Sequence, residues 1–238
     1  MQNNTNLKKL PTVTVSRMFS RGILAFRYFC HLLFSDFYHL GTRVTFSQGV
    51  TIYNGKYISL GDRVYLERNV TLKFLEEFIS YGYKRPTLKI EEAVTIGTGS
   101  IISVAKFIHI KKDVLIAPHC FITDHDHEYR DITVPIRDQG YKNVKKIIIE
   151  EGAWIGANST ICSGVTIGKN SVVGANSVVT KDVPDFSLAV GVPAKVVKRF
   201  NTVTKKWVRI SSPTIFKHRN RNIKPQSSSK SILGRISN

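Results

Sequence analysis

Aliphatic residues recur at every sixth position over much of the second half of the chain. The series starts at Ile149 and ends at Val179, and a small or β-branched residue follows each member four positions later. A period of six matches neither the roughly 3.6-residue repeat of an α-helix nor the alternation of an ordinary strand. The pattern therefore predicts a solenoid of short parallel strands with one inward aliphatic side chain per unit. The members are Ile149, Ile155, Ile161, Ile167, Val173 and Val179.

The same period occurs upstream with interruptions. A short series starts at Leu60, a longer one at Ile90, and a third at Ile110 that is two residues out of phase with the second. Two segments break the period altogether, 76–87 and 123–148, and both are rich in charged and turn-forming residues. A long loop inside a compact repeat is usually functional. We therefore expect 123–148 to protrude from the solenoid and 76–87 to form a second, smaller loop.

The two ends of the chain follow other patterns. From Val15 to Leu33, apolar residues recur at three- and four-residue spacing, which predicts an amphipathic helix. This helix would pack on the solenoid or a neighbouring subunit, or lie in a membrane surface. We expect a helical segment over 1–40, a β-helix domain over 41–200, and a basic, partly disordered tail over 201–238.

Charge is concentrated at these ends. The 238 residues carry a formal net charge of +18, and residues 199–238 hold ten Lys or Arg and no acidic residue. The tail lacks the interleaved aromatic residues of a nucleic-acid stacking platform, so a nucleic-acid partner is not expected. An anionic membrane surface or an acidic polymer suits it better. Three cysteines form no disulfide framework, and no apolar run reaches the length of about 18 residues that a membrane span needs. These features predict a cytoplasmic protein with peripheral contact at the inner membrane.

Four short sequence motifs, given at the end of this paragraph, follow one another along the chain. Together with the six-residue period, they resemble those of the hexapeptide-repeat acyltransferases over residues 41–198, and especially the galactoside, maltose and polysaccharide O-acetyltransferases. The resemblance implies an all-β fold, a left-handed parallel β-helix. It also implies a homotrimer that holds acetyl-CoA in grooves between neighbouring helices. The motifs are DHDH at 124–127, WIG at 154–156, VVTKDVP at 178–184 and GVPAK at 191–195.

Acetyl transfer from a thioester to a sugar hydroxyl needs a general base and no metal. By the family pattern His125 is that base and His127 is the second choice, with Asp126 or Glu128 available to orient the imidazole. A competing interpretation makes His119, His125 and His127 zinc ligands. Cys120 and Cys162 are expected to be structural, because they occupy positions in the repeat that favour small residues.

The resemblance also supplies candidate acetyl-CoA contacts. Trp154 is expected to form a wall of the cofactor groove, small residues to offer backbone groups to the pantetheine arm, and cations to meet the nucleotide end. The cofactor-binding candidates are Ala117, Trp154, Ala157, Ala175, Thr180, Lys181, Lys195 and Lys198.

These observations predict an acetyl-CoA-dependent O-acetyltransferase that modifies a sugar in a surface polysaccharide or its precursor. Two alternatives stay open. The first is a catalytically silent trimeric scaffold, and the second is an N-acetyltransferase of an amino sugar. The identity of the acceptor depends on loops of variable shape.

Overall fold

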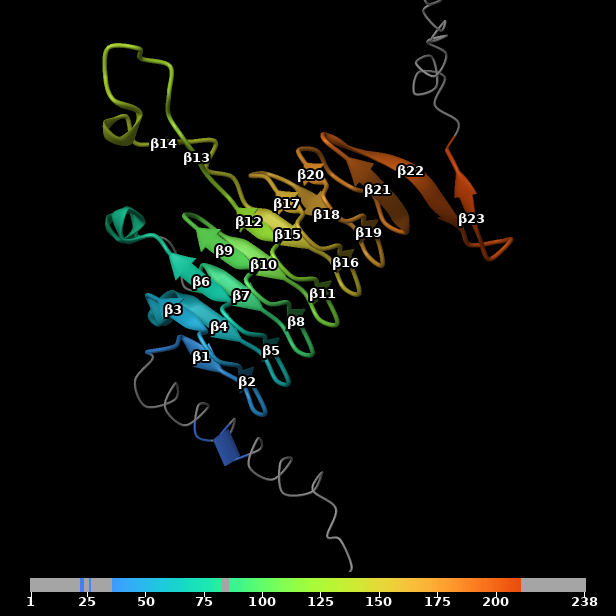
Figure 1. Ribbon diagram of the computed structural model, residues 1–238, viewed down its shortest axis with the longest axis horizontal. Coiled ribbons are helices and arrows are strands. Elements are labelled where there is room, and N and C mark those ends of the chain that lie inside the picture. Colours follow the sequence, from blue (N-terminus) through green and yellow to red (C-terminus); the bar gives the residue numbers. More distant parts are fainter. Residues whose placement is uncertain (1–21, 24–25, 27–35, 83–85, 211–238) are drawn as a thin grey trace, which may run out of the picture.

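The computed structural model describes residues 22–23, 26, 36–82 and 86–210. Over 36–186 they form a left-handed parallel β-helix, in which the chain visits three sheets in turn (Figure 1). The first sheet contains β1 (His39–Leu40), β4 (Ile58–Leu60), β7 (Leu88–Ile90), β10 (Ile108–Ile110), β15 (Ile147–Ile149) and β18 (Thr166–Ile167). The second contains β2 (Thr45–Phe46), β5 (Tyr65–Leu66), β8 (Thr95–Ile96), β11 (Leu115–Ile116), β16 (Trp154–Ile155) and β19 (Val172–Val173). The third contains β3 (Thr51–Tyr53), β6 (Thr71–Phe74), β9 (Ile101–Val104), β12 (Phe121–Thr123), β17 (Thr160–Ile161) and β20 (Val178–Val179).

Strand pairing explains the period of six. Ile149 pairs with Ile167, eighteen residues later, so one coil contains three six-residue units. Upstream, Ile90 pairs with Ile110, which makes that coil two residues longer. The extra residues lie where the third sheet turns into the first, because β9 continues to Val104 and both Val104 and Ala105 are buried there. The change of phase seen in the sequence is therefore a wider corner, and the aliphatic columns stay aligned.

The aliphatic columns fill the inside of the coil. The inward residue of nearly every strand is fully buried, and each such side chain contributes about 1.5–3 kcal/mol relative to exposure. Small residues fill the positions next to the corners. Gly156 shows why, since a Cβ added there would lie 2.5 Å from the backbone nitrogen of Ala175 in the next coil.

Both predicted loops leave the coil at the corner between the third and first sheets (Figure 1). The longer one contains β13 (Asp126–His127), the 3-10 helix η3 (Ile136–Asp138) and β14 (Tyr141–Lys142), with β13 and β14 paired antiparallel. The shorter one contains the 3-10 helix η2 (Glu76–Tyr81); another 3-10 turn, η1 (Gly55–Tyr57), precedes β4. The loops leave the same corner two coils apart, with the coil of β9 between them, and they meet where Tyr141 contacts Glu77 and Phe78.

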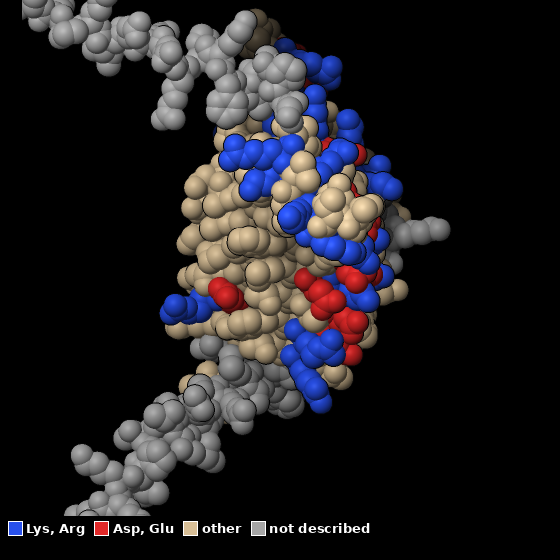
Figure 2. All heavy atoms as spheres, turned by 90° about the vertical axis from the view of Figure 1, so that its right-hand side faces the viewer, with Lys and Arg blue, Asp and Glu red and all other residues tan. Residues whose placement is uncertain are grey.

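An antiparallel ribbon continues the second sheet past the last coil. It contains β21 (Ser187–Gly191), β22 (Ala194–Asn201) and β23 (Lys206–Arg209), so ordered strand structure extends past residue 200, into the expected tail. Hydrophobic residues here are interleaved with cations, and the Trp207 ring packs edge-on against Phe200. Figure 2 shows Lys and Arg side chains gathered over this end of the molecule, beside a broad face with few charges. The rest of the expected tail, 211–238, and nearly all of the expected N-terminal helix lie outside the described residues.

Candidate active site

Asp124 anchors the corner where the longer loop begins. It follows the last residue of β12 and is fully buried. Its carboxylate accepts three backbone N–H groups of the preceding coil, from Ala105 (2.7 Å), Lys106 (2.8 Å) and Phe107 (2.8 Å). The wider corner described above exposes these N–H groups, and the carboxylate satisfies all three. A buried charge with this many donors is held in one orientation.

His125 is oriented by Asp124. Its Nδ1 lies 3.1 Å from Asp124 Oδ1 and 3.2 Å from Thr123 Oγ1, and its side chain is only 10% exposed. The carboxylate accepts a hydrogen bond from Nδ1–H, and this tautomer leaves the lone pair on Nε2. An imidazole held in this tautomer is equipped to accept a proton from a substrate.

The expected orienting groups have other partners. Asp126 accepts a hydrogen bond from the Asn143 amide at 3.0 Å. Glu128 binds the Arg130 guanidinium at 2.6 Å and the Lys142 ammonium at 3.7 Å. The expectation that either residue orients the base was wrong, because the turn after β12 directs their side chains into the loop.

Glu128 ties the longer loop together. The Arg130 guanidinium and the Tyr129 and Arg130 backbone N–H groups lower the pKa of this carboxyl from 4.5 to about 2. Lys142, on the facing strand, lies over the Tyr129 ring. The loop thus has its own charged network, separate from the coil, which fixes its two strands.

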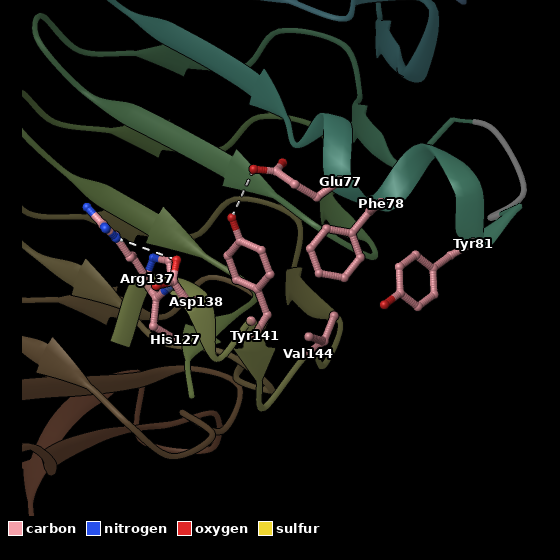
Figure 3. Close-up of a pocket in the computed structure, with 9 residues that line it drawn as sticks. Glu77, Phe78, Tyr81, His127, Arg137, Asp138, Tyr141 and Val144 are labelled. Atoms are coloured by element: carbon pink, nitrogen blue, oxygen red, sulfur yellow. Dashed lines mark hydrogen bonds and ion pairs between the residues drawn. The ribbon is translucent and has the colours of Figure 1, made fainter. Parts of the chain in front are cut away.

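A cavity of about 530 Å³ lies between the two loops (Figure 3). Tyr141 separates it from the base: the His125 ring meets Tyr141 edge-on at 5.4 Å between centroids, and the His127 ring stacks on Tyr141 at 4.9 Å. His127 therefore forms part of the cavity wall, while His125 lies behind Tyr141. The lining residues are Glu77, Phe78, Tyr81, His127, Arg137, Asp138, Gly140, Tyr141 and Val144.

The sequence did not single out the cavity residues other than His127. The broken period marked both loops but could not show that they meet. Tyr141 donates its hydroxyl to Glu77 at 3.3 Å, and burial together with the Glu77 charge raises the pKa of that hydroxyl. Sixty-four residues separate the two in sequence, so no local pattern could have linked them.

The cofactor candidates lie in two parts of the fold, one on the second sheet and its edge and the other at the loop corner. Ala117 and Ala157 follow strands of the second sheet at its turn into the third, and Trp154 projects outward from β16 with 48% of its surface exposed. Ala175 follows in the next coil, where its neighbour Asn176 donates a hydrogen bond to the Ala157 carbonyl at 2.8 Å. These residues lie in register along one edge of the coil.

Thr180 and Lys181 lie at the loop corner. They follow β20, whose Val179 pairs with Ile161, and Ile161 pairs in turn with Ile122, one coil earlier and close to His125. Lys195 and Lys198 belong to β22, which extends the second sheet, and Lys198 pairs with Leu188 in the strand row that starts at Trp154. Within one chain the structure brings Lys198 onto the sheet of Trp154 but leaves Thr180 and Lys181 at a different corner. Their roles in cofactor binding stay predictions.

Both described cysteines are at least partly buried. Cys120 is 2% exposed, and burial raises the pKa of its thiol, as it does for the partly buried Cys162.

His119 lies in the turn before β12, at the other end of that strand from His125, so the histidines do not converge. In the described ranges, no three His, Cys, Asp or Glu side chains are grouped to hold a metal ion. Across the same ranges, no helix has the length and apolarity to cross a membrane.

The sequence is similar to those of known acyltransferases. A family model described as the hexapeptide repeat of succinyl-transferase matches residues 146–181. The putative lipopolysaccharide biosynthesis O-acetyl transferase WbbJ of Escherichia coli is 31% identical over 155 residues, 60% of this chain and 79% of that protein. The probable acetyltransferase Rv3034c of Mycobacterium tuberculosis is 41% identical over 112 residues, 47% of this chain and only 37% of the relative.

Solved structures share the fold. The N-acyltransferase AntD of Bacillus cereus, in complex with dTDP and 3-hydroxybutyryl-CoA, superposes with a TM-score of 0.60 at 23% identity. The superposition covers 71% of this chain and 86% of AntD.

Proposed function

This chain belongs to the hexapeptide-repeat acyltransferases, and on that premise we propose that it is an acetyl-CoA-dependent O-acetyltransferase acting on a sugar hydroxyl. The observation that carries the proposal is the pairing of His125 with Asp124, at the mouth of a loop that borders a cavity. A silent scaffold would use Asp124 to cap the backbone donors of the corner, but it would not need an imidazole held against that carboxylate.

The pair supplies the proton transfers of the reaction. His125 Nε2 accepts the proton of the sugar hydroxyl while the hydroxyl oxygen attacks the thioester carbonyl of acetyl-CoA. The C–S bond breaks, the new ester C–O bond forms, and the imidazolium returns the proton to the departing coenzyme A sulfur. Asp124 stabilises the imidazolium between these steps without leaving its backbone donors.

Within one chain, Trp154 and the alanine edge lie apart from His125, Thr180 and Lys181 at the loop corner. A second copy placed against the face with few charges would bring Trp154 and the alanine edge of one chain to the His125 corner of another. The outward residues Leu115 and Trp154 on the second sheet, each nearly half exposed, suit such a contact. We therefore infer a homotrimer with three shared grooves, and Lys181, Lys195 and Lys198 as candidates for the phosphate groups of the nucleotide.

The acceptor is proposed to be a sugar of a cell-surface polysaccharide or of its precursor. The name of WbbJ, a putative lipopolysaccharide O-acetyl transferase, supports this class, as does the open cavity beside the base. The decisive experiment incubates the full chain with labelled acetyl-CoA and a panel of glycans. O-acetyl esters are released by mild alkali, whereas N-acetyl groups are retained. An alkali-stable product would show N-acetylation instead, and the absence of transfer to any hydroxyl would refute the proposal.

The basic end suggests where the enzyme meets its acceptor. We propose a cytoplasmic enzyme with peripheral contact at the inner membrane, where lipid-linked sugars are available. Each Lys or Arg near an anionic surface contributes about 1 kcal/mol, and salt weakens the attraction. Removing 211–238 should reduce sedimentation with vesicles that contain anionic lipid but leave acetylation of a small soluble glycoside intact. Equal sedimentation of the full and shortened chains at low salt would contradict this location.

A further inference from the structure

The cavity between the loops presents a set of aromatic rings. Phe78 and Tyr81 project from η2 with their rings stacked 5.2 Å apart, and the Tyr141 ring from β14 lies 5.1 Å from Phe78 (Figure 3). Phe78 is buried, whereas Tyr81 is 66% exposed. Rings of this kind stack on the apolar C–H faces of sugars, while polar groups at the rim bind the hydroxyls. The cavity has both kinds of group.

The net charge of the residues that line the cavity is opposite in sign to the net charge of the whole chain. Arg137 and Asp138 form an ion pair at 3.5 Å and cancel. Glu77 accepts a hydrogen bond from the Tyr141 hydroxyl. With His127 counted as neutral, Glu77 gives the lining residues a net charge of −1. The whole chain carries +18. An anionic ligand attracted to the molecule by its general charge would therefore be repelled at this cavity.

The cavity also adjoins the base. Tyr141 forms one wall, and the other side of the same residue contacts the edge of the His125 ring at 5.4 Å. A ligand in the cavity, packed against Tyr81, is separated from His125 by the Tyr141 side chain alone. The volume of about 530 Å³ is within the roughly 300–1,000 Å³ usual for small-molecule sites.

We propose that this cavity is the acceptor site, and that it selects an uncharged sugar or an amino sugar over one that carries a carboxylate or a phosphate. The inference rests on the proposed acetyl transfer and gives the acceptor a charge class. Tyr81, the exposed ring of the set, stacks on the sugar beside the wall that Phe78 and Tyr141 form, and Glu77 rejects anions placed there. Because η2 belongs to an interruption of the coil, the selection is made by residues outside the repeat.

The test measures binding without turnover, using a matched pair of probes. Methyl β-D-glucopyranoside and methyl β-D-glucuronide differ only at C6, where the second carries a carboxylate. We expect the full-length protein to bind the uncharged probe about tenfold more tightly, in calorimetry or ligand-observed NMR. Glu77→Gln should reduce this preference to about twofold, and the matched control Glu76→Gln, an exposed carboxyl on the same 3-10 helix, should preserve it. Tyr81→Ala should weaken both probes by about three- to tenfold.

Failure of the cavity and failure of the proposed function give different results. Equal binding of the two probes, a preference unchanged by Glu77→Gln, or no binding of the uncharged probe at the limit of its solubility would overturn the inference about the cavity. Acetyl transfer to neutral glycans in the same preparation would still leave the enzyme assignment standing. Selective binding that depends on Glu77, combined with no acetyl transfer to any glycan, would keep the sugar site and refute the transferase.

Discussion

At the scale of single residues, two adjacent side chains carry the proposed chemistry. Asp124 is buried and fixed by three backbone donors, and His125 is fixed by Asp124. The tautomer of the base thus depends on a corner of the preceding coil. A proton acceptor built this way needs no movement before it acts.

Replacing the base should abolish most of the activity. We expect His125→Ala to lower kcat by roughly 10²–10⁴-fold with coenzyme A affinity unchanged, because general-base catalysis contributes this much. His127→Ala should cost less and act mainly on the acceptor KM, since His127 stacks on Tyr141 in the cavity wall. Steady-state kinetics with both substrates varied would separate the two effects. Near wild-type turnover in the His125 variant would assign the base elsewhere.

The sequence predicted His125 and missed its partner. The motif places four polar side chains in a row, and the chemistry expected of a carboxylate suits Asp126 as well as Asp124. Only the turn after β12 distinguishes them, because it directs Asp124 into the corner and Asp126 toward Asn143. That turn depends on the wider corner one coil earlier, which the sequence marks only as a two-residue change of phase and without showing which side chain caps it.

At the scale of elements, the coil was predictable and the contact between its loops was not. Aliphatic spacing fixed the strands because one inward residue per unit is a local rule. The breaks in that spacing located both loops. Their meeting across Tyr141 and Glu77 depends on which coils they leave, and this required the three-dimensional register.

The charged network of the longer loop should show a characteristic pH dependence. The folded-state pKa of Glu128 is lowered to about 2, so its contribution to stability is fully present above a pH of about 4.5 and is lost as the pH falls through 2. Glu128→Gln should therefore melt below the wild type at pH 7. The difference should shrink between pH 4.5 and 2. Melting curves across this range test the prediction, and a constant difference down to pH 2 would contradict it.

Stacking of the coils should be sensitive to single methyl groups at the corners. Gly156→Ala would place a Cβ 2.5 Å from the Ala175 nitrogen, so the two coils must separate. We expect a loss of roughly 1–3 kcal/mol in the free energy of unfolding, measured by denaturant titration. Asn176→Gly is the control, because that residue already has a positive φ of 58° and no glycine contact is altered. Equal stability of both variants and the wild type would show that this corner is loosely packed.

At the scale of the whole molecule, the candidate site residues lie in two separate parts of the three-sheet β-helix. His125 belongs to the corner that bears the loops, whereas Trp154 belongs to the second sheet. The groove proposed above therefore needs a neighbouring copy, and a broad face with few charges is present for such a contact (Figure 2).

Mixing two inactive variants tests whether the site is shared. His125→Ala and Trp154→Ala chains, unfolded together and refolded, should regain activity, because about a quarter of randomly assembled interfaces combine an intact His125 with an intact Trp154 from the next chain. Light scattering should give about 80 kDa, three times the 26.8 kDa of one chain. Each variant refolded alone serves as the control. A fully active species of 26.8 kDa would refute the shared groove.

The ribbon after the last coil has a consequence for growth of the protein into fibres. A stack of parallel strands ends in unpaired backbone groups, which invite a second molecule to add its own coil and extend the stack indefinitely. Here β21 is followed by antiparallel β22 and β23, and β22 also contacts β20. An added parallel coil would meet a strand of the wrong direction in one sheet and so could not continue all three at once. The reversal of chain direction after Gly191 thus prevents further copies from stacking end to end.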